Sequence, residues 1–451
     1  MKSKLYKICT IISAIIFIFF LGLRCSMHYF NSNNVKDTIA YLSSNEFQGR
    51  LCGTEENYNA TNYITKTFEE LNLDKMGETY KEGFQVTAPF RNENTPSLSI
   101  NKNGKEIKSY KYGKDFKEDM INFNSSSEIL SSKDSVNIFP SSISFKKGGN
   151  IFLFYISKEE NFIFRSSFIN DSPISFAVAI TKDVYDTMAS SLKSGSEISI
   201  SLPYSTKKTE IFNVVSKIEG RNDKLEPLIL TAHFDHMGCD TLGNIYNGAL
   251  DNASGASFLI ELSKYMSSLP KPNRDIIFVA LNAEEFGLLG SNDFASKYKE
   301  ELKGAKVINF DMIGAKDYPI TFMSGANSKG KDSKLINDLE KLCNDNNLNF
   351  DVKYEDSSDH ASFINNGFDS LTVSHSDVSK IHTPNDIVEF ISEDAIDNAF
   401  LLTNKYIMEN CYGIVTKIIL NPFLHALSFI VFLLLISHPL IKKIDNSKRK
   451  I

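Results

Sequence analysis

Five short segments of the chain carry histidine and carboxylate side chains whose types suit a metal centre. They are residues 232–236, 248–255, 282–291, 309–314 and 382–386. Imidazole nitrogens and carboxylate oxygens are ligands that borderline ions such as zinc accept together. Two ions about 3.5–4 Å apart need a bridging carboxylate and further protein ligands on each ion. Two histidines, two aspartates and two glutamates from these segments meet that need.

Each piece alone is weak evidence. A lone histidine after a strand is more often a hydrogen-bonded structural residue than a ligand, and a glutamate pair is usually a solvated surface. However, Glu284 and Glu285 directly follow the six-residue apolar run 276–281. Adjacent carboxylates so close to a core are costly unless a positive charge meets them. The combination of segments therefore favours a metal as that charge.

The elements that must position these residues alternate between two kinds of pattern. Apolar runs typical of buried strands occur at 228–232, 276–281, 307–310 and 370–373, and helical patterns at 57–72, 256–266, 334–345 and 393–409. Alternating strands and helices predict an α/β fold with a mostly parallel central sheet. Active sites of open α/β sheets form at the carboxyl ends of the strands. We therefore expect the five segments to lie at that edge.

Residues 87–204 have a different texture. They are rich in Ser, Asn and Lys and contain short β-like runs such as 151–155 and 198–202. No cluster of His, Asp and Glu there suggests a site. We interpret this stretch as an inserted, β-rich subdomain with a lid or positioning role.

Two apolar segments predict membrane anchoring. Residues 8–23 form an uncharged run between Lys7 and Arg24, which as a helix spans roughly 24 Å against a hydrocarbon core of about 30 Å. A cleaved signal peptide is the alternative, but the small residues that signal peptidase requires are absent, which favours a retained anchor. Residues 422–441 form the second uncharged run, long enough to cross a bilayer.

Basic residues flank both runs on their terminal sides, at Lys2, Lys4, Lys7, Lys442, Lys443, Lys448, Arg449 and Lys450. The positive-inside rule then places both termini in the cytoplasm and residues from about 30 to 415 outside the cell. The net charge of −6 and the absence of a visible basic face in the soluble part give no reason to expect a nucleic-acid partner. Six scattered cysteines are too few for a disulfide scaffold, and their pairing stays open.

The order and spacing of the five segments resemble the M28 family of co-catalytic zinc peptidases, which includes secreted bacterial aminopeptidases. The segment 47–54, with its Gly-Arg and Gly-Thr pairs, resembles the opening motif of that family. The resemblance implies a three-layer zinc-exopeptidase fold. It assigns 36–86 and 205–412 to the peptidase domain, and 87–204 to the place where some relatives carry a protease-associated domain.

The resemblance also implies the role of each site residue. Two zinc ions per chain are expected, with the ligands His233, Asp251, Glu285, Asp311 and His382. Asp251 would bridge the ions, and its peptide bond to Asn252 is often cis in relatives. Glu284 would be the general base, and Asp235 would hold His233 in the correct tautomer.

A few positions depart from the family pattern or have lesser expected roles. His236 stands where relatives often have Ser, and Phe286 where a small or acidic residue is common. We interpret His236 and Cys239 as bystanders near the site. The segment 358–360 resembles one that lines the substrate pocket in relatives, for which a supporting role is expected.

These observations predict an extracellular, membrane-anchored exopeptidase that releases N-terminal residues from peptides. Carboxypeptidase action on the same scaffold is an alternative, although no basic pocket for a substrate carboxylate is visible in the sequence. Glutaminyl cyclisation would use a single zinc in this family, and the intact two-metal set argues against it. A non-catalytic receptor or binding module that retained the fold is a further alternative, although such modules typically lose ligands or the base. Side-chain specificity, native substrate, oligomeric state and physiological metal stay open.

Overall fold

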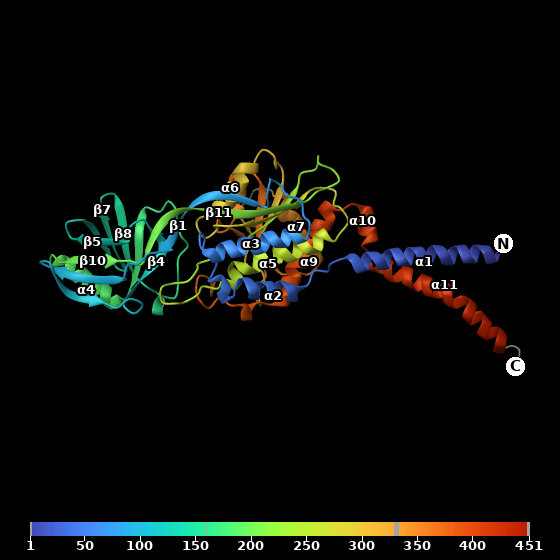
Figure 1. Ribbon diagram of the computed structural model, residues 1–451, viewed down its shortest axis with the longest axis horizontal. Helices are drawn as coiled ribbons and strands as arrows, with labels where there is room; N and C mark the ends of the chain where they lie inside the picture. The colour runs from blue at the N-terminus through green and yellow to red at the C-terminus, as the bar shows by residue number, and fades with distance from the viewer. Residues whose placement is uncertain (1, 159, 329–332, 449–451) are drawn as a thin grey trace.

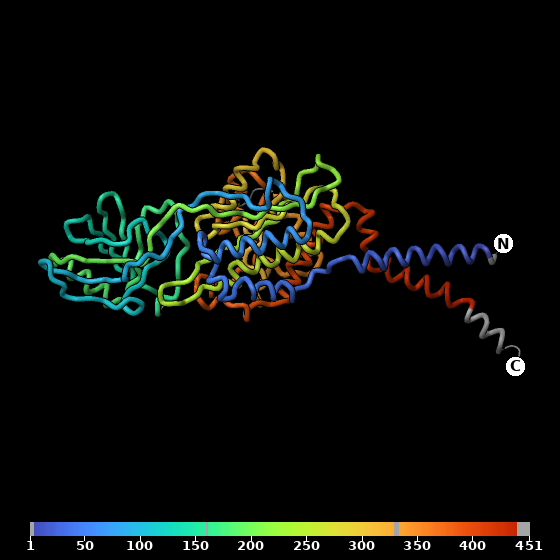
Figure 2. Tube along the Cα trace, in the orientation of Figure 1, coloured from blue at the N-terminus to red at the C-terminus, as the bar shows by residue number. Residues whose placement is uncertain are grey.

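The computed structural model describes residues 2–158, 160–328 and 333–448. The molecule is elongated: a β-rich lobe lies at one end, an α/β body in the middle, and two long helices extend from the other end (Figure 1). The trace in Figure 2 shows two neighbouring strands passing from the body into the lobe and back. The body positions the candidate site.

An eight-stranded sheet forms the centre of the body. Its strands, in spatial order, are β1 (Lys81–Arg91), β11 (Tyr204–Ile218), β13 (Ile276–Leu281), β12 (Leu228–His233), β14 (Lys306–Phe310), β17 (Asp369–Ser374), β15 (Ile320–Ser324) and β16 (Phe350–Tyr354). The four middle strands, β13, β12, β14 and β17, run parallel. The predicted α/β fold with a mostly parallel core is confirmed, while β1, β11, β15 and β16 are additional to the four predicted strands.

Helices cover both faces of this sheet. One layer holds α2 (Ser32–Leu42), α3 (Glu55–Glu70), α5 (Gly255–Ser267), α7 (Lys334–Asp345) and α9 (Glu393–Cys411), and the other holds α6 (Leu289–Tyr298) and α8 (His360–Asn365). Successive side chains of a strand point to opposite faces. Accordingly, Leu228 and Leu230 pack with the first layer and Ile229 with the second. This three-layer packing explains why the central strands are buried along nearly their whole length.

Capping residues set the starts of several helices that the sequence pattern predicts. The side chains of Thr54, Ser333 and Ser392 accept hydrogen bonds from the first turns of α3, α7 and α9, respectively. Such caps satisfy backbone N–H groups that have no partner within the helix.

The β-rich lobe lies between β1 and β11, which pair antiparallel along the whole of β1. One sheet of the lobe contains β3 (Lys105–Tyr110), β2 (Ser97–Lys102), β10 (Glu197–Ser201) and β5 (Ser127–Ser131). The other contains β4 (Phe116–Phe123), β9 (Ile174–Ile180), β8 (Asn150–Ile156), β7 (Ser142–Lys147) and β6 (Ser135–Phe139), and α4 (Lys182–Lys193) packs against the lobe. We propose 87–204 as the boundaries of this insert, between peptidase segments 36–86 and 205–412.

Buried charges join the lobe to the body. Lys117 of β4 donates a 2.6 Å hydrogen bond to the Asp240 carboxylate of the body, and both side chains are at most 1% exposed. Arg165 of the lobe is fully buried and donates to the carbonyl of Met237 at 2.8 Å. Lobe and body also share one hydrophobic core, in which Phe116 and Tyr246 both take part.

Two terminal helices are long and apolar enough to cross a membrane. These are α1 (Lys2–Ser26) and α11 (Pro422–Lys448), with candidate spans at Lys4–Ser26 and Pro422–Pro439. They contact each other through Phe17, whose ring lies 5.1 Å from that of Phe432 and 5.2 Å from that of Phe429. Arg449 and Lys450, two of the basic residues that flank the second predicted span, lie outside the described residues. The six cysteines are all free.

Candidate metal centre

The structure brings all seven predicted site residues to the carboxyl edge of the parallel strands. His233 ends β12, Asp311 directly follows β14, and Glu284 and Glu285 lie in the turn after β13. The remaining three lie in connecting segments: Asp235 after β12, Asp251 in the turn before α5, and His382 in the loop after β17. Parallel strands place their carboxyl ends on one side, so residues far apart in sequence meet there.

Asp251 is shared by two groups of candidate ligands. Its Oδ1 lies 3.6 Å from His233 Nε2, which is itself 3.6 Å from Asp311 Oδ1. Its Oδ2 lies 3.3 Å from His382 Nε2, which is itself 3.3 Å from Glu285 Oε2. One carboxylate thus presents a different oxygen to each of two three-residue groups.

These spacings fit zinc. Ligands that bind zinc tetrahedrally at about 2.0–2.1 Å lie about 3.3 Å apart along each edge of the tetrahedron. The measured separations between ligand atoms of 3.3–3.6 Å match this edge closely. In addition, His233 Nε2 and Asp311 Oδ1 are buried without a hydrogen-bond partner among the described residues. A buried polar atom of this kind needs a partner, and a cation supplies one.

The backbone around Asp251 is held from both sides. The Asp251–Asn252 peptide bond is cis, as the family resemblance implied. The carboxylate of Asp386 accepts hydrogen bonds from the N–H groups of Leu250 at 2.8 Å and Asp251 at 2.9 Å. The Asn252 side chain accepts from Met312 N at 3.1 Å, which ties the turn to the residue after Asp311. Asp386, for which the sequence suggested no role, therefore supports the shared carboxylate.

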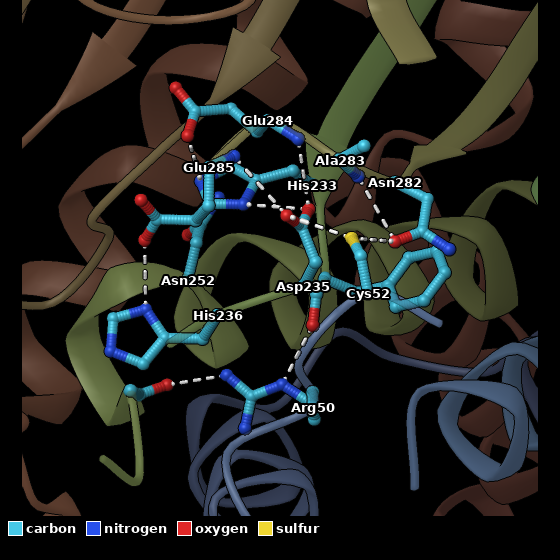
Figure 3. Close-up of polar contacts among 12 residues, drawn as sticks. Arg50, Cys52, His233, Asp235, His236, Asn252, Asn282, Ala283, Glu284 and Glu285 are labelled. Carbon is cyan, nitrogen blue, oxygen red and sulfur yellow. Dashed lines mark hydrogen bonds and ion pairs between the residues drawn. The ribbon is translucent and has the colours of Figure 1, made fainter. Parts of the chain in front are cut away.

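Asp235 links His233 to the glutamate pair (Figure 3). Its Oδ1 lies 3.5 Å from His233 Nδ1. Its two carboxylate oxygens also accept the N–H groups of Glu284 at 3.1 Å and Glu285 at 3.2 Å. A buried carboxylate is costly without hydrogen-bond donors around it. These contacts therefore both satisfy Asp235 and orient the imidazole of His233.

Arg50 supports the same region from below (Figure 3). Its fully buried guanidinium donates to four backbone carbonyls, namely those of Leu42, Phe234, Asn247 and Gly248, at 2.6–2.9 Å. Burial lowers the pKa of Arg50 to about 10. The Gly-Arg pair that resembled the family motif thus fixes the loops on either side of the site.

The two adjacent glutamates have opposite electrostatic environments. Burial raises the pKa of Glu284 well above its ordinary value, because its surroundings are poor in water and rich in carboxylates. Burial acts in the same direction on Glu285, but the imidazoles of His382 and His236 outweigh it and hold its pKa well below the ordinary value. Glu284 is therefore the carboxylate better suited to accept a proton.

His236 is placed differently from the sequence interpretation. It is buried, and its Nδ1 lies 3.0 Å from Glu285 Oε1 and 3.9 Å from Asp251 Oδ2. The bystander interpretation is therefore wrong for His236, which contacts one candidate ligand directly. Its position three residues after His233 was the available signal. Cys239 is half-buried and free.

The inserted lobe contributes contacts that the sequence did not indicate. Ser167 Oγ donates to Glu285 Oε2 at 2.8 Å, and Phe168 N donates to Glu285 O at 2.9 Å. The carbonyl of Arg165 lies 3.1 Å from His382 Nδ1, and Arg165 N donates to His382 O at 3.1 Å. Because Nδ1 of His382 is engaged by a carbonyl, its Nε2 is left to face Asp251 and Glu285.

A cavity of about 340 Å³ opens at the site. Its apolar wall consists of Met312, Met323, Val378 and Ile381, and Lys353 and Glu355 carry charges on the same wall. The predicted pocket segment 358–360 acts behind this wall, because Ser358 donates a 2.6 Å hydrogen bond to Asp311 Oδ2. It supports a candidate ligand and does not line the cavity.

Comparisons with known proteins agree with this geometry. The profile of peptidase family M28 matches residues 213–407. The aminopeptidase YwaD of Bacillus subtilis is 29% identical over 211 residues, which is 44% of each chain, so the match spans less than half the length of that relative. A vacuolar membrane protease of Kluyveromyces lactis is 38% identical over 107 residues, 24% of this chain and 11% of that protein.

Solved structures share the fold. An aminopeptidase from Aneurinibacillus sp. strain AM-1 gives a TM-score of 0.62 at 20% identity, covering 85% of this chain and 95% of the other. BSAP, a zinc aminopeptidase from Bacillus subtilis, gives 0.60 at 17% identity, covering 85% and 96%. Residues 213–407 of this chain are thus similar in sequence to peptidase family M28, and the chain shares its fold with solved aminopeptidases.

Proposed function

We propose that the chain is a membrane-anchored aminopeptidase that uses two zinc ions to remove N-terminal residues from peptides. The observation that carries the proposal is the shared carboxylate of Asp251, which faces His233 and Asp311 with one oxygen and His382 and Glu285 with the other. Relatives named as aminopeptidases support the reaction class.

Each residue of the site has a role in this proposal. Zinc held by the two groups would polarise the scissile carbonyl and would make water a stronger acid. Glu284, at the cavity wall, takes a proton from the attacking water on its carboxylate and delivers it to the leaving amine. Asp235 holds the tautomer of His233, and the Arg165 carbonyl does the same for His382.

The size of the cavity supports action at a chain end. Small-molecule sites usually occupy about 300–1,000 Å³, and the cavity of about 340 Å³ lies near the lower limit. Its apolar wall of Met312, Met323, Val378 and Ile381 suits the side chain of a single residue beside the scissile bond.

The terminal helices support an extracellular location. Both extend from the same end of the body and contact each other, so the two termini lie on one side of a membrane that they cross (Figure 1). The basic flanks favour the cytoplasm for that side. The peptidase body and the lobe would then lie outside.

One observation favours a second candidate, carboxypeptidase action. Lys353 is exposed and lines the cavity, which supplies a cation for a substrate carboxylate. Glu355, which directly follows β16, also lines the cavity, and its negative charge balances that of Lys353. The two reactions differ in the peptide end that must be free, so blocked peptides separate them.

The test compares the detergent-solubilised full chain with Glu284→Gln and with Glu355→Gln, a carboxylate on the same cavity wall. Each is loaded with zinc, its metal content is measured, and hydrolysis of free, N-acetylated and C-amidated peptides is followed, with a chelated sample beside it. We expect two zinc ions in all three proteins and a rate that falls about 10²–10⁴-fold in Glu284→Gln only. C-amidated peptides should be cleaved and N-acetylated ones spared.

Other outcomes would change the assignment. Full activity of Glu284→Gln would refute its role as the base. Cleavage of N-acetylated but not C-amidated peptides would replace the aminopeptidase by a carboxypeptidase. Two bound zinc ions without any hydrolysis would favour a binding module.

A further inference from the structure

A second cavity, of about 450 Å³, lies in the inserted lobe. It forms on the outer face of the sheet that contains β4, β8 and β9, beneath the segment that connects β8 to β9. Its apolar lining comes from Ile121, Leu153, Ile156, Phe162, Phe164 and Ala179. Side chains of a strand alternate between faces, so Phe152 and Phe154 fill the core of the lobe while Leu153 faces the cavity.

Phe164 connects this cavity with the metal site. Its ring stacks on the ring of His382 with centroids 5.8 Å apart, and it lines the lobe cavity on its other side. Two consecutive serines line different cavities: Ser166 lines the lobe cavity and Ser167 lines the metal-site cavity. The two cavities are therefore neighbours across one short segment of backbone.

Phe164 is also unusually exposed for its type. It is 43% exposed although it lies beside a buried segment. Exposed large apolar side chains at the rim of a concave surface are typical of ligand-binding sites.

Among the polar groups that line the lobe cavity, Lys158 is exposed, while Asp119, Tyr155 and Ser166 are hydrogen bonded to one another. The carboxylate of Asp119 accepts hydrogen bonds at 2.8 Å from the N–H groups of Met120 and Ser166 and from the hydroxyl groups of Tyr155 and Ser166. The surface that remains for a ligand is mainly aliphatic and aromatic. The chemistry of the cavity therefore selects an apolar group rather than a charged one.

The lobe cavity has a fixed position relative to the metal site. The main chain of Arg165 and Phe168 is hydrogen bonded to His382 and Glu285, and the Arg165 side chain is buried against Met237 O. A ligand in the cavity is thus held at a defined distance from the candidate zinc ligands.

We propose that the lobe cavity binds an apolar side chain of the peptide substrate beyond the scissile bond, at the second or third residue. This proposal rests on the aminopeptidase function proposed above. An extended peptide advances about 3.3–3.6 Å per residue, and the Phe164 ring that lines the lobe cavity stacks on the His382 ring at the metal site, so the first residues after the scissile bond are those that can reach the lobe. A peptide whose first residue occupies the metal-site cavity then passes Phe164 and reaches the lobe.

The experiment uses the zinc-loaded full chain in detergent and two kinds of substrate. Leucinamide has ammonia as its leaving group and reports the metal site alone. Leucyl tripeptides with phenylalanine or serine at the second or the third position report the lobe cavity. The variants are Leu153→Asp and Leu153→Ala, and the control is Ile138→Asp, on β6 at the far edge of the same sheet and 40% exposed.

We expect the unmodified chain to have a kcat/KM about tenfold higher for the phenylalanine peptides at one of the two positions, the size of effect that an apolar pocket gives. Leu153→Asp should abolish this preference, Leu153→Ala should reduce it roughly threefold, and Ile138→Asp should retain it, all with unchanged leucinamide hydrolysis and zinc content.

Three results would overturn the proposal. One is equal hydrolysis of phenylalanine and serine peptides by the unmodified chain. The second is a preference that survives in Leu153→Asp or, if that variant loses leucinamide hydrolysis by misfolding, in Leu153→Ala. The third is failure of the unmodified, zinc-loaded chain to hydrolyse leucinamide or any peptide, which would overturn the aminopeptidase function as well.

Discussion

In the proposed two-zinc site, replacing Ser167 by Ala should weaken the binding of one zinc ion and leave the binding of the other unchanged. Ser167 Oγ donates a 2.8 Å hydrogen bond to Oε2 of Glu285, the oxygen that also faces His382. A hydrogen bond to a charged group contributes about 1.5–3 kcal/mol. Ser167 is only half-buried, so water can replace part of the bond, and we take the lower limit. About 1.5 kcal/mol corresponds to roughly a tenfold loss of affinity.

The asymmetry follows from the geometry. Glu285 and His382 belong to one candidate group, whereas His233 and Asp311 belong to the other. Among the described residues, the Ser167 side chain hydrogen bonds to Glu285 of the first group and to no member of the second. Zinc bound by His233 and Asp311 should therefore keep its affinity.

The assay is stepwise zinc titration of the full chain against a competing chelator. Ser166→Ala is the matched control, because the neighbouring hydroxyl donates at the same 2.8 Å to Asp119 and not to a candidate ligand. Unchanged affinity of both ions in Ser167→Ala, or an equal loss at both, would refute the positioning role. An equal loss in Ser166→Ala would show that any change in this segment has the same effect.

Two further predictions concern stability and topology. Arg50→Met leaves four backbone carbonyls without their donor and should lower the free energy of unfolding by about 3 kcal/mol or more. Arg91→Met, at an exposed position, should change it by less than about 0.5 kcal/mol. Urea unfolding followed by near-ultraviolet circular dichroism measures both variants, and equal midpoints would contradict the buried role of Arg50. Protease added to intact cells should cleave the segment between α1 and α11 and spare tags at both termini, and loss of either tag would refute the proposed orientation.

The sequence was sufficient for the parts of the fold that depend on strong local patterns. Strands β12, β13, β14 and β17 are buried along nearly their whole length because both of their faces are covered by helices, and their sequences are correspondingly rich in apolar residues. The chemistry of the site followed from where polar residues interrupt those runs. His233 closes β12 and Asp311 follows β14, at the edge where parallel strands meet.

Other features depend on contacts between distant segments, which no local pattern reveals. The segment 320–324 (β15) joins the sheet in spite of lying between less periodic stretches, because it pairs antiparallel with β17 and parallel with β16. Ser167 lies 118 positions from Glu285 in the chain and is an ordinary serine in a serine-rich region. Its proximity to the site exists only after the lobe has folded against the body.

The inserted lobe is better described as a fixed wall of the site than as a lid. To open, a lid would have to separate Lys117 from Asp240, an ion pair at most 1% exposed. Separating the pair breaks the 2.6 Å hydrogen bond between the two charges, an interaction that contributes about 1.5–3 kcal/mol. The same motion would withdraw the Arg165 carbonyl from His382 and Ser167 from Glu285. A lobe that moved freely would therefore disturb one candidate zinc ion at each opening, which favours the positioning role over the lid.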